Sequence, residues 1–239
     1  LVKFKQDHLE EKSMDRMIFF WNNRNARRKQ SGTLIFWFNE FAKQVGPDNV
    51  CLLMHTDPRD PHGQDLEYII NELDIADGRI MLSKNKIPSD LLSGMYNIAA
   101  CTINISDAEG FGLATLESLS CETPIVVNMT GGLQEQVTDG EEWFGIGLEP
   151  ASKAIIGSQQ VPYIYEDRLN KEEFIAALHK VYNMSKEERY ELGKKGRAHV
   201  IKNYNFDDFR NRWPELMDDV HEKNGSWDHR EDLSEVSGR

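Results

Sequence analysis

Short apolar runs alternate with longer amphipathic stretches between residues 17 and 128. The runs are nearly continuous in hydrophobicity, as MIFFW and IVV are, which is typical of strands buried on both faces. The longer stretches place apolar residues three and four positions apart, as Leu34–Phe41 does, which is typical of helices. The pattern predicts strands over Met17–Trp21, Asn49–Met54, Arg79–Leu82, Cys101–Ile105 and Pro124–Asn128, and helices near Gly32–Val45, Gln64–Leu73, Ser89–Tyr96 and Gly112–Cys121.

Strands that alternate with helices indicate repeated βαβ units and a parallel sheet. We therefore expect an α/β fold, a doubly wound Rossmann-like parallel sheet, over residues 17–205. The alternation stops after Gly140, and residues 141–165 are expected to form a long loop with one or two short strands. Helices are expected to resume after the N-cap candidates Asn170 and Ser185. Residues 1–16 are a short lead-in, 206–223 a last helix, and 224–239 a polar tail that we expect to be flexible.

Composition narrows the class of protein. The 239 residues, 39% hydrophobic and 28% charged, can fold as one large domain or two small ones. No apolar run approaches the roughly 18 residues of a membrane span, so we expect no integral membrane segment and no signal peptide. A formal net charge of -12 argues against nucleic acid as a partner. Cysteines 51, 101 and 121 lack metal-ligand spacing and are expected to be structural thiols in a reducing, cytoplasmic setting.

One polar cluster has the chemistry of metal ligands without their usual setting. It consists of His55, Asp57, Asp60 and His62, and the intervening prolines break the segment into turns. We therefore expect no metal site there.

The segment SDAEGFGLATLE, residues 106–117, directly follows the strand predicted at 101–105. In an open parallel sheet, ligands bind at the carboxyl ends of strands. Gly110 and Gly112 would let the backbone approach a ligand, and the free amides of the next helix favour an anionic oxygen such as that of phosphate. Glu109 and Glu117 could accept hydrogen bonds from sugar hydroxyls. On spacing alone, a tight turn with two solvated glutamates explains the segment equally well.

The same segment resembles the EGFGLxxLE signature of retaining GT-B glycosyltransferases of the family 4, or group 1, type. The resemblance continues through CETPIVV (residues 121–127) and TGGLQE (residues 130–135), which are similar to the CGTPVVA and GGxxE segments of that family. It implies one half of a GT-B architecture, the C-terminal donor-binding domain. An N-terminal acceptor domain is then expected to be missing from this chain.

The resemblance also implies roles for single residues. Glu109 would contact the hydroxyls of the donor sugar, and Glu117 would contact the ribose of the nucleotide. The distal phosphate would be held by the backbone amides of Gly110, Phe111, Gly112 and Leu113.

Family members bind the diphosphate with an arginine and a lysine in the loop after the first strand, a place that Arg24 and Lys29 occupy. Such cations stabilise the negative charge of a departing nucleoside diphosphate. Arg27 or Arg28 could replace either partner. The nucleotide base would lie against the loop that contains Lys86 and Ile87, where nothing selects uracil, guanine or adenine.

The expected function is transfer of a hexose from a UDP-, GDP- or ADP-sugar to an acceptor hydroxyl. No metal and no other cofactor are expected to be needed, and this chain alone is expected to be inactive. Two alternatives are a non-catalytic nucleotide-sugar binding module and a GT-B sugar-nucleotide epimerase. The helix at 206–223 resembles the crossover helix of the family, and its apolar face is expected to be partly uncovered, which could promote a homodimer. That face consists of Phe209, Trp213, Leu216 and Val220.

Overall fold

The computed structural model describes residue 4 and residues 13–157 and 159–225, so most of the expected lead-in and tail lies outside the described residues. The chain divides into two compact units, residues 1–200 and 201–239. Within the described part of the first unit, six strands form one sheet in the order β3-β2-β1-β4-β5-β6, and each adjacent pair is parallel. The strands are β1 (Met17–Asn22), β2 (Val50–His55), β3 (Ile80–Ser83), β4 (Cys101–Asn104), β5 (Ile125–Asn128) and β6 (Ile146–Leu148). The doubly wound α/β prediction is confirmed.

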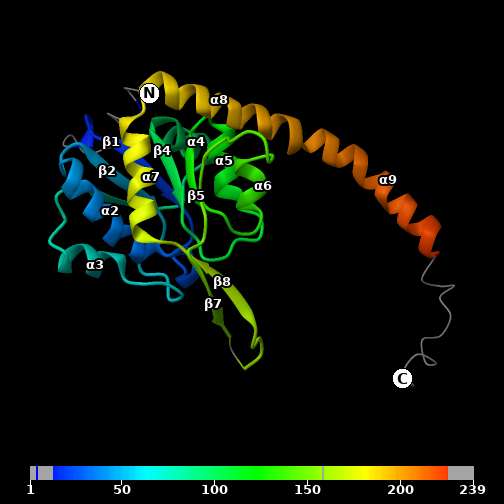
Figure 1. Cartoon of the computed structure of the whole chain (residues 1–239), viewed down its shortest axis with the longest axis horizontal. Coiled ribbons are helices and arrows are strands. Elements are labelled where there is room, and N and C mark those ends of the chain that lie inside the picture. The colour runs from blue at the N-terminus through cyan, green and yellow to red at the C-terminus, as the bar shows by residue number, and fades with distance from the viewer. Residues whose placement is uncertain (1–3, 5–12, 158, 226–239) are drawn as a thin grey trace. The chain divides into compact units, whose positions relative to one another are not determined.

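Helices cover both faces of this sheet (Figure 1). Each predicted helix of the region up to residue 121 is found within about two residues of its expected limits. In chain order the helices of this unit are η2, a 3-10 turn (Arg27–Lys29), α2 (Ser31–Val45), α3 (Leu66–Glu72), α4 (Ser89–Ile98), α5 (Leu113–Ser120), α6 (Leu133–Val137), α7 (Lys171–Asn183) and α8 (Lys186–Asn203), which runs across the boundary between the units. The described helices are too short or too polar to cross a lipid bilayer.

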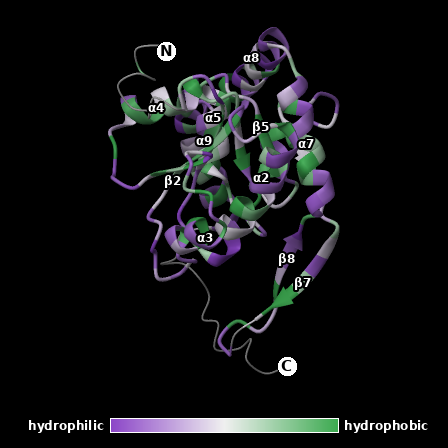
Figure 2. Cartoon of the chain, turned by 90° about the vertical axis from the view of Figure 1, so that its left-hand side faces the viewer, coloured by the Kyte–Doolittle hydropathy of each residue, from purple (hydrophilic) through white to green (hydrophobic). Residues whose placement is uncertain are grey.

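Strand β1 supplies the centre of the core because its side chains alternate between the two faces. Phe19 and Trp21 pack with apolar residues of α2, α3 and α7 on one face. Ile18 and Phe20 pack with residues of α4 on the other. Hydrophobic colouring in strand β5 and hydrophilic colouring over much of α3 and α7 follow the same division between core and surface (Figure 2). Burying each such side chain contributes about 1.5–3 kcal/mol.

Two predicted helix starts have the expected capping bonds. The side chain of Asn170 accepts a hydrogen bond from the backbone N–H of Glu172 at 2.8 Å, at the start of α7. At the start of α8, the carboxylate of Glu188 accepts from the N–H of Ser185 at 2.7 Å, and the Ser185 hydroxyl accepts from the N–H of Glu188 at 3.1 Å. This reciprocal pair satisfies two amides that the helix itself leaves unbonded.

The segment expected to be a long loop is more regular than its sequence indicates. Besides β6, it contains most of an antiparallel hairpin made of β7 (Ser152–Ile156) and β8 (Ile164–Arg168). The hairpin extends from the body of the unit (Figure 1), and most of its side chains are exposed. Because neither face is covered along its whole length, the sequence lacks the alternation that marks a half-buried strand. Helix α6 was not predicted, and the short strand β6 was not placed within the segment expected to hold one or two strands, since five and three residues are too few to show a period.

The second unit contains helix α9 (Phe206–Asn224), one residue longer than predicted. Its apolar side chains are 45–71% exposed, from Val220 at the low end to Phe206 at the high end. The rings of Phe206, Phe209 and Trp213 stack in succession along the helix. The uncovered apolar face expected from the sequence is therefore present in this unit.

Candidate functional site

The strand order reverses between β1 and β4, which lie side by side in the sheet. In doubly wound folds the ligand crevice lies outside the carboxyl ends of the strands at such a switch point. Both segments singled out in the sequence start there, because residues 23–30 follow β1 and residues 105–113 follow β4. A backbone hydrogen bond joins them, from the N–H of Asp107 to the carbonyl of Arg28 at 2.8 Å.

Two cationic side chains of the turn after β1 bond to Glu109. Its Oε2 accepts hydrogen bonds from Nζ of Lys29 and, at 3.4 Å, from Nη1 of Arg28. Nη1 of Arg28 also donates to the carbonyl of Ala108 at 2.6 Å. The side chains of Lys29 and Glu109 are only 9% and 10% exposed, so neither charge would be tolerated there without the other. Burial lowers the pKa of Lys29, and the bond to Glu109 opposes that shift.

Arg24 lies elsewhere. Its guanidinium donates to the carboxylate of Asp60 at 2.6 Å and lies 2.7 Å from Nδ1 of His62. Arg24 holds the pKa of Asp60 well below its usual range. Among the contacts of the described residues, none joins Arg24 to Glu109. The geometry thus favours Arg28 as the arginine at this site, which is one of the alternatives left open by the sequence.

The turn between β4 and α5 depends on glycines for two different reasons. Gly112 caps α5 at φ 89°, a left-handed conformation in which other residues are strained. A Cβ on Gly131 would lie 1.7 Å from the carbonyl oxygen of Glu109. Only a residue without a side chain can therefore pack against the turn at this position. A Cβ on Gly110, in contrast, would meet no atom of the described residues within 4 Å. The backbone at Gly110 is therefore open to a ligand.

Two further contacts hold this turn in place. The N–H of Gly132 donates to the carbonyl of Gly110 at 3.0 Å, and Nε2 of Gln136 donates to the carbonyl of Phe111 at 2.5 Å. The side chains of Phe111 and Leu113 are exposed beside the turn. Of the four residues predicted to hold a phosphate, Gly110, Phe111 and Leu113 are exposed and Gly112 is buried.

Glu117 lies about one turn further along α5 and has two neutral donors. Its Oε2 accepts from the hydroxyl of Tyr96 at 2.7 Å and from Nδ2 of Asn22 at 3.2 Å. Asn22 also donates to the Tyr96 oxygen at 2.9 Å, which closes a triangle across β1, α4 and α5. Burial raises the pKa of Tyr96, so its hydroxyl keeps its proton and donates. Sequence reasoning gave no role to Asn22 or Tyr96, although Asn22 ends the strand at the switch point.

No contact among the described residues joins the remaining predicted residues to this site. Ile87 packs against the core cluster around Phe20, and Lys86 is exposed. Nδ1 of His55 lies 2.9 Å from the hydroxyl of Ser83. No group of His, Cys, Asp and Glu side chains among the described residues has a geometry that could hold a metal ion. Of the three cysteines expected to be buried structural thiols, Cys51 and Cys101 are buried and Cys121 is only partly buried.

Comparison with known proteins identifies relatives over most of the chain. The family described as Glycosyl transferases group 1 matches residues 3–199. The chain is 38% identical over 92 residues to the D-inositol 3-phosphate glycosyltransferase of Thermomonospora curvata, which is 38% of this chain and 21% of that protein. It is 23% identical over 189 residues to the N-acetyl-alpha-D-glucosaminyl L-malate synthase of Bacillus anthracis, 79% of this chain and 46% of that protein.

Solved structures of other proteins share the fold. The structure of sucrose-phosphate synthase from Thermosynechococcus elongatus matches with a TM-score of 0.70 at 21% identity, over 93% of this chain and 49% of that one. The chain thus spans between about a fifth and about half of the length of these proteins. Its sheet, flanked by helices, matches that of GT-B glycosyltransferases. Since the family match extends over most of its residues, the chain belongs to the glycosyl transferases group 1 family.

Proposed function

We propose that this chain is the donor-binding half of a retaining glycosyltransferase that moves a hexose from a nucleoside-diphosphate sugar to an acceptor hydroxyl. The observation that supports this most strongly is the meeting of Lys29, Arg28, Glu109 and the open backbone at Gly110 at the switch point of the sheet. Cations and free amides suit a diphosphate, and a carboxylate suits sugar hydroxyls. The family match supplies the reaction class.

The diphosphate would exchange partners with Glu109. Lys29 and Arg28 pair with the Glu109 carboxylate. A bound diphosphate takes over these cations, and the carboxylate is then available to accept hydrogen bonds from the donor sugar. The two charges are thus held in place before the substrate arrives, which lowers the cost of arranging them in the transition state.

The chemical step needs charge stabilisation more than proton transfer from these residues. As the bond between the anomeric carbon and the diphosphate oxygen breaks, the electron pair goes to the leaving diphosphate and the sugar gains oxocarbenium character. The acceptor oxygen then forms the new bond to the anomeric carbon and passes its proton to an oxygen of the leaving diphosphate. Arg28, Lys29 and the amides of residues 110–113 stabilise the leaving group, and Glu109 orients the sugar. We further propose that no metal ion is required, because these groups supply the positive charge.

Glu117 is assigned to the ribose of the nucleotide. Tyr96 and Asn22 both donate to the same oxygen of Glu117 and so fix the orientation of its carboxylate. The other carboxylate oxygen can accept from ribose hydroxyls. Replacing Glu117 by alanine is expected to weaken nucleotide binding by about 1–3 kcal/mol. An unchanged affinity would remove Glu117 from this role.

The decisive experiment separates transfer from binding alone. The complete protein is incubated with UDP-, GDP- or ADP-sugars in a chelator, with water as the acceptor of the sugar, and release of the nucleoside diphosphate is followed. We expect one donor to be consumed, and the Glu109→Gln variant to be slower by about 100-fold. The matched variant Glu72→Gln, at an exposed position in α3, should keep the parental rate. Tight binding without any release would indicate a non-catalytic binding module instead.

A further inference from the structure

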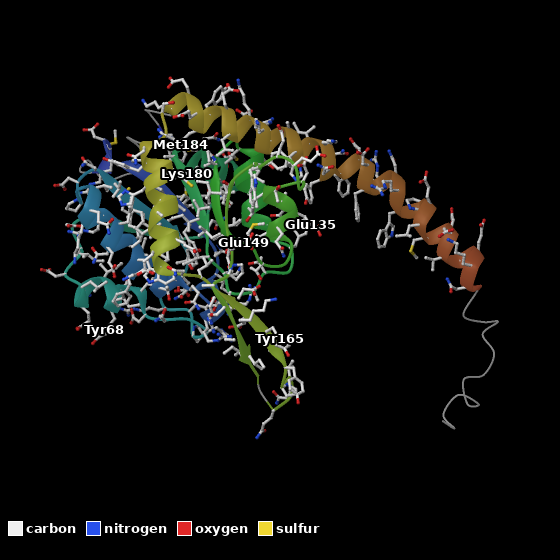
Figure 3. All side chains as sticks on the ribbon, viewed as in Figure 1. Tyr68, Glu135, Glu149, Tyr165, Lys180 and Met184 are labelled. Carbon is white, nitrogen blue, oxygen red and sulfur yellow. The ribbon has the colours of Figure 1, made fainter. Side chains whose placement is uncertain are left out.

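The hairpin β7–β8 has an exposed outer part and a deeply buried base. Ile155 and Tyr165, paired across the two strands, are each 61% exposed (Figure 3 labels Tyr165). One residue further along β8, Glu166 is only 2% exposed although it is a carboxylate. A buried charge is costly unless it has partners. The partners of Glu166 lie in the loops of the candidate site.

Two backbone hydrogen bonds join the hairpin to the turn Arg27–Lys29, and a side-chain bond continues the line to β5. The carbonyl of Arg28 accepts from the N–H of Asp107 at 2.8 Å. The carbonyl of Asp107 accepts from the N–H of Asp167 in β8 at 2.7 Å. The carbonyl of Asp167 accepts from Nδ2 of Asn128 at 3.3 Å. The turn η2, the loop after β4, strand β8 and the end of β5 are therefore linked one to the next.

Four charged side chains reinforce this line. Arg27 donates two hydrogen bonds to Glu166, at 2.9 and 2.5 Å. Arg168 donates to Glu166 at 3.1 Å and also to Asp107, which is 3% exposed. Gln30 donates to Asp107 from the other end of the turn. Two cations thus balance two buried carboxylates, and the residues on both sides of Arg28 and Lys29 are tied to β8 or to its partner Asp107.

This network accounts for the orientation of the turn Arg27–Lys29. Arg27 and Arg28 are neighbours with the same side chain. In the described part of the chain, Arg28 contacts Glu109, whereas Arg27 contacts Glu166. The Arg27 bond holds the pKa of Glu166 below its ordinary value, so the pair stays ionised near neutral pH. Arg27 is thereby directed to the hairpin, and Arg28 and Lys29 are directed to the site.

We propose that Glu166 and Arg168 are positioning residues for the diphosphate cations, and that the hairpin β7–β8 fixes the turn Arg27–Lys29 in the orientation that presents Arg28 and Lys29 to the donor. The inference rests on the proposed function, since it assigns a purpose to the same site. It gives the base of the hairpin a role in donor binding without any contact between the hairpin and the donor.

The test compares two charge-removing variants within the hairpin. Glu166→Gln keeps the size of the side chain and removes the charge that holds Arg27. Lys153→Met removes an exposed charge of β7 that pairs only loosely with Asp167, at 3.7 Å. Calorimetric titration of the complete protein with UDP, GDP and ADP should show that Glu166→Gln weakens binding of the preferred nucleotide by roughly fivefold to fiftyfold, the range typical of coupled contacts. Lys153→Met should bind like the parent.

A second variant shows whether Glu166 acts through Arg27. In an Arg27→Gln background, adding Glu166→Gln should change the affinity by less than about twofold, because the link is already broken. If Glu166→Gln alone leaves the affinity unchanged, or tightens binding by removing a negative charge, the positioning role is wrong. If the unaltered protein binds none of the nucleotides, the proposed function fails and the inference falls with it.

Hydrogen–deuterium exchange supplies a readout that needs no ligand. In the folded protein, the amides of residues 27–30 should exchange faster in Glu166→Gln than in the parent or in Lys153→Met. Equal exchange in all three would show that the hairpin does not hold the turn, even if the parent binds nucleotide. A Glu166→Gln protein that does not fold would be replaced by Arg168→Lys, for which a smaller change in the same direction is expected.

Discussion

The two loops at the switch point hold their functional groups by different means. The loop after β4 relies on backbone geometry, since Gly112 has a left-handed conformation and Gly131 packs against the carbonyl of Glu109. The loop after β1 relies on ion pairs, since Arg28 and Lys29 are held by Glu109 and Arg27 by Glu166. The loop after β4 should therefore be disturbed by substitutions that add atoms, and the loop after β1 by substitutions that remove charges. Four predictions test this difference, beginning with the largest effect.

Removing the buried cation should do the most damage. Lys29→Met takes one charge from the diphosphate and leaves the Glu109 carboxylate, 10% exposed, with the more distant Arg28 as its cation. Loss of one member of a buried charge pair costs about 2–5 kcal/mol. We expect the affinity for the nucleoside diphosphate to fall by about 100-fold in titration calorimetry. A fall of less than threefold would mean that Lys29 does not face the ligand.

Two glycines of the other loop should respond in opposite ways. Gly112→Ala must adopt φ 89° and would bring its Cβ within 2.4 Å of the Leu133 side chain, so it should lower the free energy of unfolding by about 2 kcal/mol. Gly110→Ala meets nothing within 4 Å among the described residues and should leave stability within about 0.5 kcal/mol while weakening nucleotide binding. Chemical denaturation and titration of both variants check this. Equal loss of stability in the two would contradict the distinction.

The arginines of the first loop provide a matched pair. Arg28→Ala should weaken nucleoside-diphosphate binding about tenfold, the cost of one charged hydrogen bond. Arg24→Ala should change it by less than about twofold, because Arg24 is bound to Asp60. The reverse result would show that ligand binding moves Arg24 into the site, and would restore the assignment first made from the sequence.

The smallest expected effect is a change of affinity with pH. Burial lowers the pKa of Lys29 below its ordinary value of 10.5. A diphosphate binds the charged form, so affinity should be fully present below the pKa of Lys29 and fall as pH rises through it, before pH 10.5. Lys29→Arg, which stays charged, should keep its affinity over the same range. Ionisation of the nucleotide base at high pH affects binding to the parent and to Lys29→Arg equally, so it cancels when the two profiles are compared. Parallel pH profiles would contradict the prediction.

The difference between the loops also explains what the sequence could predict. The strands up to residue 128 and the turn at Gly110 and Gly112 were predicted, because burial and backbone geometry leave marks in the local sequence. The register of the basic turn was not, because Arg24 is directed by Asp60, 36 residues away, and Arg27 by Glu166, 139 residues away. The side chains of Asn22 and Tyr96 meet Glu117 only in the fold. One or two short strands were expected in residues 141–165, but their pairing as a hairpin was not predicted, because the strands are buried only in part and show no alternation.

We propose that the loops at the carboxyl ends of β1 and β4 bind a nucleoside diphosphate. The most direct measurement is calorimetric titration of the complete, folded protein with UDP, GDP and ADP in a chelator, alongside Lys29→Met. We expect one nucleotide to bind in preference to the others, and Lys29→Met to weaken this binding by about 100-fold. Absence of binding to all three nucleotides, or equal affinity in the parent and Lys29→Met, would contradict it.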